Sequence, residues 1–146
     1  MSLPITTGVI NYQTPDLTCQ AVESFRSFYP DEFLLLIDNG SRDDSASSLR
    51  RLQLTAPNST FLIENKDNCH HGPAMHQGMQ SAKAPYVFFI DSDCIIKNGG
   101  FLERMSHALE EHSGNYVIGK RIFMNRRGFD IDERAGAKSL TFVLTA

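Results

Sequence analysis

Two carboxylates spaced by one residue, Asp91 and Asp93, are the side chains of this chain best suited to chemistry. They directly follow the apolar segment 86–90, which is too short for an ordinary helix and rich in residues that favour strands. We therefore predict a buried central strand there. Side chains two apart on a strand share a face, so both carboxylates should project together from its C-terminal end. They would repel each other without a cation or hydroxyl donors between them, so the pair predicts a site for a divalent metal or a sugar hydroxyl. The alternative is a plain strand-to-loop turn, for which Asp is also suited.

Polar residues also follow two other predicted strands: Asn11-Tyr12-Gln13 after residues 5–11, and Asp38-Asn39-Gly40-Ser41 after residues 33–37. Parallel strands would bring all three groups to one edge of the sheet, where open α/β sheets bind ligands. Such a site suits a nucleotide. Tyr12 would stack on a base, and Asp38 would accept a hydrogen bond from a base N–H or a ribose hydroxyl. Asp91 would accept a hydrogen bond from a ribose hydroxyl, and Asp93 would bind a metal that bridges the diphosphate. The chain has neither G-x-G-x-x-G after the first strand nor a P-loop, so metal and side chains must neutralise the phosphates.

The elements that must position these residues alternate along the chain. Thr14-Pro15 predicts a helix start, and Tyr29-Pro30 its end. A second helix is capped by Asp43 or Asp44, and Gly72-Pro73 opens a third with Met75, Met79 and Ala82 on one face. Further strands are predicted at 61–63 and 116–118, and a helix with Phe101, Leu102, Met105 and Leu109 closes near Ser113-Gly114. This alternation predicts an α/β fold with helices on both faces of a mostly parallel sheet, while Asn125 to Ser139 is predicted as a long loop.

Bulk properties narrow the class. The 146 residues are predicted to form one domain. The net charge of -3 excludes the class of proteins that bind nucleic acid through an overall positive charge. Three cysteines without a C-x-x-C pair fit a reduced, cytoplasmic compartment. No signal peptide is evident, and no apolar run approaches the roughly 20 residues of a membrane-spanning helix, although peripheral membrane attachment stays open.

Five motifs together carry a family resemblance: Val9-Ile-Asn-Tyr-Gln-Thr-Pro15, Leu36-Ile-Asp-Asn-Gly-Ser41, Glu64-Asn65, the segment 72–79 and Phe89-Ile-Asp-Ser-Asp93. In their order and spacing the chain resembles the nucleotide-binding half of a family 2 glycosyltransferase with the GT-A fold. The resemblance covers roughly the first 110 residues, and the last motif is similar to the family's D-x-D.

The resemblance implies a fold, an activity and a set of site residues. The fold is a GT-A type, Rossmann-like three-layer sandwich. The activity is metal-dependent, inverting transfer of a sugar from a nucleotide diphosphate to an acceptor hydroxyl, with Mn²⁺ or Mg²⁺ held by Asp93. The implied donor is a UDP-, GDP- or dTDP-sugar, and the acceptor is a glycan or lipid-linked molecule in cell-surface polysaccharide synthesis. Nucleotide contacts are expected from Asn11, Tyr12, Asp38, Asn65, His70, His71 and Asp91, where His70 or His71 stands in for the family's usual Asn or Arg. Asp91 and Asp93 are the expected catalytic carboxylates.

The acceptor side is less defined by sequence. The family's general base lies in its C-terminal half, and Asp130, Asp132 and Glu133 are only candidates for it. The chain is short for the family, so we expect a domain truncated before the full acceptor-binding half, with poor transfer activity by itself.

Three alternatives remain. One alternative is a zinc site formed by Cys69, His70, His71 and His76, which is disfavoured because His71 and His76 do not share a helical face. A nucleotide-sugar-binding module without transfer activity would bind donor but not turn it over. A response-regulator receiver domain is disfavoured because Asn11-Tyr12 stands where that class needs an acidic pair.

Overall fold

A computed structural model describes residues 3–111, 122–124 and 138–140. The chain divides into two compact units, Met1–Glu103 and Arg104–Ala146. The first contains a four-stranded parallel sheet in the order β3-β2-β1-β4. Its strands are β1 (Ile5–Asn11), β2 (Leu34–Asp38), β3 (Thr60–Glu64) and β4 (Tyr86–Ile90), joined by the helices α1 (Pro15–Arg26), α2 (Ser45–Thr55) and α3 (His71–Gln80).

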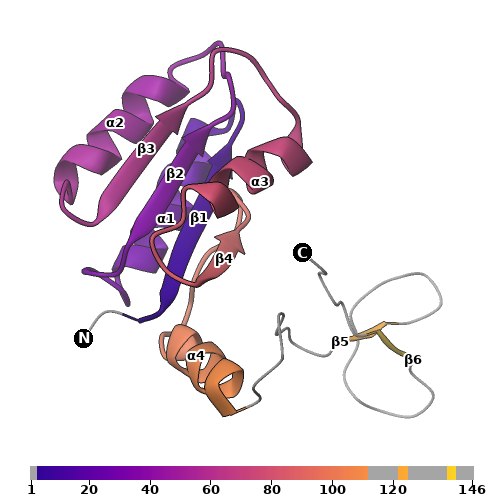
Figure 1. Ribbon diagram of the computed structural model, residues 1–146. Helices are drawn as coiled ribbons and strands as arrows, with labels where there is room; N and C mark the ends of the chain where they lie inside the picture. Colours follow the sequence, from indigo (N-terminus) through magenta and orange to yellow (C-terminus); the bar gives the residue numbers. More distant parts are fainter. Residues whose placement is uncertain (1–2, 112–121, 125–137, 141–146) are drawn as a thin grey trace. The chain divides into compact units, whose positions relative to one another are not determined.

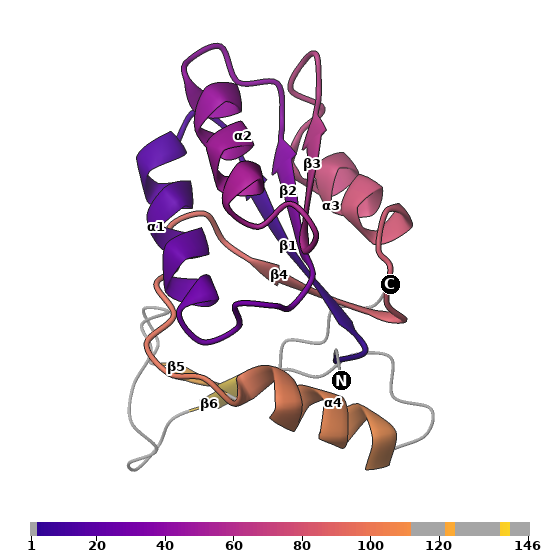
Figure 2. The ribbon, with the colours of Figure 1, turned by 90° about the vertical axis from the view of Figure 1, so that its left-hand side faces the viewer.

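The first unit has three layers. Figures 1 and 2 show α1 and α2 on one face of the sheet and α3 on the other. All five residues of β2 are buried, and Leu34, Leu35, Leu36 and Ile37 are fully inaccessible. A strand covered by helices on both faces must be apolar along its whole length, which explains the unbroken Leu-Leu-Leu-Ile run. The predicted α/β alternation and parallel sheet are confirmed.

The strand register brings the polar residues to one edge. Asn11, the last residue of β1, pairs with Asp38 of β2, which in turn pairs with Glu64 of β3. On the other side, Val9 pairs with Ile90 of β4. The residues after β1, β2 and β4 therefore leave the sheet at the same edge.

The position of β4 differs from the prediction of a buried central strand. In the part of the chain that the structure describes, β4 lies at one edge of the sheet, beside β1. Only Ile90 is buried, and residues 86–89 are half-buried. The prediction of a buried strand was wrong, and among the described residues β4 is not central. An apolar run reports hydrophobicity, whereas strand order depends on pairing between distant segments.

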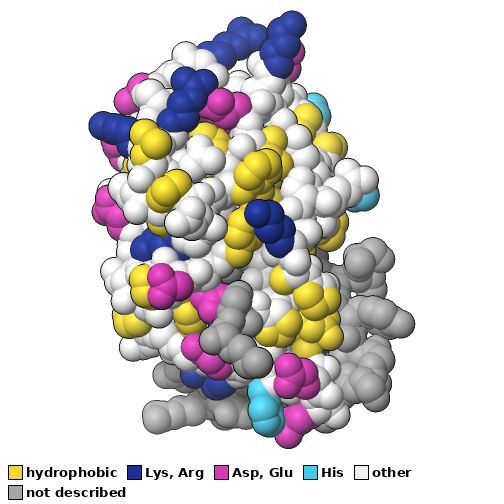
Figure 3. Space-filling view, turned by 60° about the vertical axis from the view of Figure 1, so that its left-hand side comes forward, with side chains coloured by type: hydrophobic (Ala, Val, Ile, Leu, Met, Phe, Trp, Pro, Cys, Tyr) yellow, Lys and Arg dark blue, Asp and Glu magenta, His cyan; other side chains and the backbone are white. Residues whose placement is uncertain are grey.

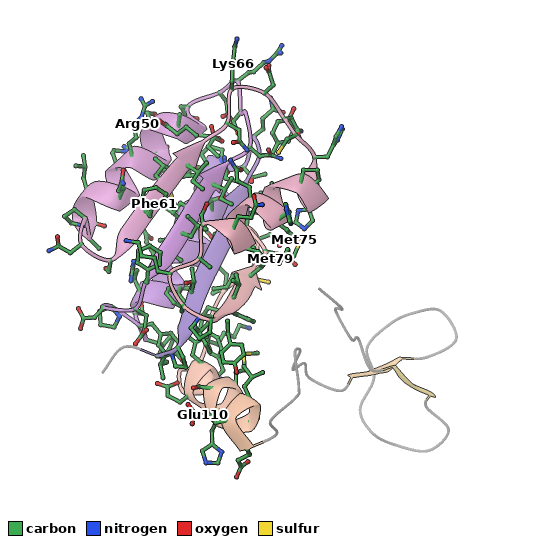
Figure 4. All side chains as sticks on the ribbon, in the orientation of Figure 1. Arg50, Phe61, Lys66, Met75, Met79 and Glu110 are labelled. Carbon is green, nitrogen blue, oxygen red and sulfur yellow. The ribbon has the colours of Figure 1, made fainter. Side chains whose placement is uncertain are left out.

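Helix α3 packs on the sheet through small residues rather than through the predicted methionine face. Ala74 and Gly78 are its buried residues, while Met79 is 42% exposed; Figure 4 marks Met75 and Met79 on this helix. A Cβ on Gly78 would lie 2.9 Å from the Phe89 ring and 3.2 Å from Ile37 Cδ1. The bulky Phe89 of β4 already fills that space, so α3 approaches the sheet closely only where its own residues are small.

Arg26 ties the end of α1 to the sheet. Its guanidinium donates to the carbonyl oxygens of Tyr29, Pro30, Glu32 and Ser59 and to the Thr60 hydroxyl, at 2.6–3.2 Å. Burial lowers the pKa of Arg26. The fan of donors in one planar group satisfies several turn carbonyls at once and fixes the connection between α1 and β2.

The helix starts differ in detail from simple capping. Thr14 precedes α1, but its hydroxyl donates to Asn11 Oδ1 at 3.3 Å rather than capping the helix. At α2, Asp44 occupies the cap position, while Asp43 accepts from the Ser45 amide at 3.0 Å. The predicted helices are confirmed, and the strand predicted from Phe33 begins one residue later.

The described part of the second unit is small. Helix α4 (Phe101–Glu111) crosses the boundary between the units, and β5 (Ile122–Met124) pairs antiparallel with β6 (Lys138–Leu140). The predicted loop 125–139 is therefore corrected at its end, because Lys138 and Ser139 belong to β6. The predicted strand 116–118, the helix end at Ser113-Gly114 and the acidic residues Asp130, Asp132 and Glu133 lie outside the described residues.

Two surface properties bear on function. On the face shown in Figure 3, Lys and Arg side chains lie among Asp and Glu side chains, so neither sign of charge dominates there. Among the described residues, no helix has the length and apolar character required to cross a membrane.

Candidate functional site

A pocket opens at the C-terminal ends of β1, β2 and β4. Its volume is about 540 Å³, within the range of small-molecule sites in proteins. Its wall combines residues that follow three strands with residues that precede α3: Ile10, Tyr12, Thr14, Leu17, Asn39, Asn68, His70, His71, Asp91, Ser92 and Asp93. The carboxylates, imidazoles and one exposed tyrosine ring thus meet around a single cavity.

Asn11 links the ends of β1 and β2 through hydrogen bonds but does not line the pocket. It is fully buried, and its Nδ2 donates to Asp38 Oδ1 at 3.0 Å and to Ser41 Oγ at 3.2 Å. Its Oδ1 accepts from the Thr18 hydroxyl at 2.8 Å and from that of Thr14. Both donors and both lone pairs of the amide are used within the protein, so Asn11 fastens β1 to β2 and to the start of α1.

Asp91 and Asp93 leave β4 in a tight turn. The Cys94 amide donates to the Asp91 carbonyl at 3.0 Å, and the hydroxyl oxygens of Thr14 and Ser92 lie within hydrogen-bond distance, 3.4 Å apart. Ligand atoms of Asp91, Asp93 and Cys94 all lie within 4.8 Å of one another, and all three side chains are exposed. Two carboxylates at this spacing supply the oxygen ligands that Mg²⁺ and Mn²⁺ prefer, so the donor set fits a divalent cation.

The two histidines belong to the segment that enters α3. His70 and His71 both line the pocket, and His70 precedes the first turn of the helix. Its backbone has φ 70° and ψ 167°, a conformation that is almost confined to glycine. A non-glycine residue in such a conformation at a pocket wall points to a role for that residue in ligand binding.

The structure thus divides the predicted site residues into two groups. Tyr12, His70, His71, Asp91 and Asp93 line the pocket, whereas Asn11, Asp38 and Asn65 do not. Asp38 is only 3% exposed.

Sequence reasoning missed six pocket residues: Thr14, Asn39, Asn68, Ser92 and the apolar Ile10 and Leu17. Asn39 and Ser92 lie within the polar motifs from which Asp38, Asp91 and Asp93 were predicted. Their position in those motifs was the signal that could have identified them.

The zinc alternative finds no support at the histidine segment. In residues 3–111, 122–124 and 138–140, the group of at least three His, Cys, Asp or Glu side chains close enough to hold an ion is Asp91, Asp93 and Cys94. Cys69 instead donates its thiol to Asn39 Oδ1 at 3.0 Å. It serves a hydrogen-bond network rather than an ion.

Comparison with known proteins identifies the family. The model of the family described as glycosyl transferase family 2 matches residues 6–139. The chain belongs to this family. Membership excludes the receiver-domain alternative. Among curated proteins, this family 2 chain is 26% identical over 120 residues to the glycosyltransferase GlyG of Streptococcus pneumoniae serotype 4, covering 82% of this chain and 39% of that protein.

Solved structures agree on the fold. The mannosyltransferase PcManGT from Pyrobaculum calidifontis, in complex with GDP-Man and Mn²⁺, is similar with a TM-score of 0.61 and 19% identity over 75% of this chain and 32% of its own. S. aureus TarS 1-349 in complex with UDP has a TM-score of 0.60 and 13% identity over 81% of this chain and 40% of its own. The GT-A type fold predicted from sequence is confirmed. This chain spans well under half the length of the relatives it matches.

Proposed function

We propose that this family 2 chain binds the nucleoside diphosphate part of a nucleotide sugar in the pocket at the ends of β1, β2 and β4, and that it is the donor-binding part of a glycosyltransferase. The observation that carries the proposal is the meeting of Tyr12, His70, His71, Asp91 and Asp93 around one cavity of about 540 Å³. An aromatic face, imidazole donors and paired carboxylates match a base, phosphates and a ribose or metal, respectively. The GDP-Man, Mn²⁺ and UDP in the similar structures support the same assignment.

Individual roles follow from position. Tyr12 is 42% exposed and offers its ring for stacking on the base. Asp91 accepts from a ribose hydroxyl, and Asp93 is a ligand of Mn²⁺ or Mg²⁺. His70 or His71 donates to the base or to a phosphate. Asp38 does not line the pocket and is 3% exposed, so the proposed contact with a base N–H requires the ligand to reach the carboxylate oxygen that Asn11 leaves free.

Asn11 and Asn65 do not line the pocket, and we propose that they support the nucleotide contacts indirectly. Asn11 fixes Asp38 and Ser41, while Asn65 holds the loop before α3.

The reaction is transfer of the sugar to an acceptor hydroxyl, with inversion at the anomeric carbon. Asp93 would hold a divalent cation, which when bound would act as a Lewis acid and stabilise the negative charge on the departing diphosphate. The protein side chains orient the donor and hold the phosphates on one side of the anomeric carbon. A carboxylate on the opposite side, acting as general base, would accept the proton of the attacking hydroxyl.

The binding test is a thermal-shift panel of UDP, GDP and dTDP with Mn²⁺, with Mg²⁺ and with chelator. A nucleotide at 100 times its Kd should raise the free energy of unfolding by about 2.7 kcal/mol. The increase should be smaller with chelator than with Mn²⁺ or Mg²⁺ if Asp93 holds the ion. A melting temperature that none of the three nucleotides changes under any metal condition would refute the site.

Catalysis is tested separately from binding. Release of nucleoside diphosphate from the matching nucleotide sugar, measured with candidate glycan or lipid-linked acceptors, distinguishes transfer from binding alone. Stoichiometric binding without turnover is the result expected both of a donor-binding part by itself and of a nucleotide-sugar-binding module, whereas steady transfer to a defined acceptor would exclude the module.

A further inference from the structure

The side-chain amide of Asn39 holds the loop that precedes α3. Asn39 follows β2 directly and is 3% exposed. Its Nδ2 donates to Asn68 Oδ1 at 3.1 Å and to the His70 carbonyl at 3.3 Å. Its Oδ1 accepts from the Cys69 amide at 3.2 Å and the Cys69 thiol at 3.0 Å. One buried side chain thus contacts three consecutive residues of the loop, 68–70.

The neighbouring Gly40 allows the loop to lie this close. Gly40 has φ +75°, and a Cβ built on it would lie 2.2 Å from the carbonyl carbon of Asp67. The loop backbone therefore rests directly against the backbone of residue 40, in space that any other residue would fill.

Asn65 and Gln77 brace the same amide from behind. Asn65 Nδ2 donates to Asn39 Oδ1 at 3.1 Å. Asn65 and Gln77 also exchange two hydrogen bonds, Asn65 Nδ2 to Gln77 Oε1 at 3.0 Å and Gln77 Nε2 to Asn65 Oδ1 at 2.9 Å. Gln77 lies on α3 and Asn65 just after β3, so the network joins β2, β3 and α3 beneath the loop. Neither residue lines the pocket.

The loop so held contains the strained residue of the site. His70 keeps a backbone conformation that is unfavourable for any residue other than glycine and persists only where surrounding contacts enforce it. The enforcing contacts are visible: the His70 amide donates to Asn68 Oδ1 at 2.7 Å, and its carbonyl accepts from Asn39. Asn68 Oδ1 and the His70 carbonyl both accept hydrogen bonds from Asn39. Asn39 in turn is bonded to Asn65, and Asn65 to Gln77.

We propose that Asn65 and Gln77 are positioning residues for nucleotide binding, acting through Asn39 to hold His70 and His71 in place before the ligand arrives. The inference rests on the proposed function, because it assigns the two histidines to the nucleotide. It adds that their placement is set by an amide network outside the pocket. Holding the donors in place beforehand removes the ordering cost that a mobile loop would add to binding.

The test uses Gln77→Ala, with Gln80→Ala as its control on the same helix. Gln80 is exposed. Hydrogen exchange should become about 2- to 13-fold faster at the Cys69 and His70 amides in Gln77→Ala, the factor for one net hydrogen bond, and stay unchanged in Gln80→Ala. Affinity for the nucleoside diphosphate that binds wild type best should weaken by a similar factor.

A double-mutant cycle then separates positioning from general destabilisation. In a His70→Ala/His71→Ala background, Gln77→Ala should cause no further loss of affinity, because the groups it positions are gone. Asn65→Ala should repeat both results, which guards against a folding defect peculiar to either variant.

The outcomes distinguish the two proposals. Unchanged exchange in Gln77→Ala and Asn65→Ala, or an undiminished affinity loss in the histidine-free background, would overturn the positioning role alone. Failure of wild type to bind UDP, GDP or dTDP would overturn the proposed function, and this inference with it.

Discussion

Replacing His70 by glycine and by alanine provides the sharpest test of the site geometry. Both changes remove the imidazole from the pocket, but only glycine relieves the backbone at φ 70° and ψ 167°. The comparison therefore separates the contribution of the side chain to binding from the strain that its presence imposes on the fold.

The expected difference follows from two opposing contributions. Relief of the strained conformation favours glycine by about 1–3 kcal/mol, while the greater freedom of glycine in the unfolded chain disfavours it by about 0.4–1 kcal/mol. The midpoints leave His70→Gly more stable than His70→Ala by about 1 kcal/mol. For a chain of this size that corresponds to a melting temperature higher by roughly 2–4 °C.

His76 offers a matched control on the same segment. It is exposed within α3, where glycine should be less stable than alanine by about 1 kcal/mol because helical conformation costs glycine more entropy. The sign of the difference should therefore reverse between positions 70 and 76. Denaturant unfolding of the four variants measures it.

Binding supplies the second readout. His70→Gly and His70→Ala should both lose affinity for the nucleoside diphosphate, by the worth of a hydrogen bond of about 0.5–1.5 kcal/mol if the partner is neutral and up to about 3 if it is charged. A glycine variant less stable than the alanine variant would refute the strained backbone. Unchanged affinity in both would remove His70 from the nucleotide site.

Other predictions concern separate parts of the first unit. Asp93→Ala should abolish the metal dependence of nucleotide binding while the fold survives, whereas Asp91→Ala should weaken nucleoside binding even with chelator; equal, metal-independent losses measured by calorimetry would contradict this division. Tyr29→Phe should cost about 1–3 kcal/mol in urea unfolding, because the Tyr29 hydroxyl accepts from the amides of Phe101 and Leu102 and both would lose their partner. Burial raises the pKa of Tyr29, so its contribution to stability should be complete below the ordinary tyrosine pKa of about 10 and be lost as pH rises through the raised value; wild type and Tyr29→Phe losing equal stability between pH 9 and pH 12 would argue against it. Gly40→Ala should destabilise by at least about 2 kcal/mol, from overpacking against Asp67 and from the positive φ, and a melting temperature like that of wild type would show that the loop does not rest on residue 40.

Much of the fold could be predicted because its signals are local. The strands at 5–11 and 86–90, the helix after Thr14 and the helix opened by Gly72-Pro73 are encoded by apolar runs and by residues that start helices, all within a few positions of one another. Parallel strands then imply that the residues around Asn11 and Asp38 lie at the same end of the sheet, and the structure pairs these two residues directly. Local patterns also sufficed to place Tyr12 and Asp91 at one edge.

The site could be predicted only in part, because the role of a polar residue depends on its distant partners. Asn11 and Tyr12 are neighbours in sequence, and both were predicted to contact the nucleotide. Asn11 instead makes four hydrogen bonds within the protein, whereas Tyr12 lines the pocket. Asn65 similarly turned inward to Gln77 and Asn39. Sequence spacing gave no indication of which amides would find partners inside the protein.

By itself, the sequence determined the alternation of strands and helices, the family resemblance and the carboxylate pair Asp91 and Asp93, because each is written in short-range patterns of residue type. Only the tertiary structure decided that β4 lies beside β1, that α3 packs through Ala74 and Gly78, and that an amide network holds His70. These features depend on the volumes and hydrogen-bonding groups of residues far apart in the chain. Close packing and the need to satisfy buried polar groups settle them only when all the elements are in place.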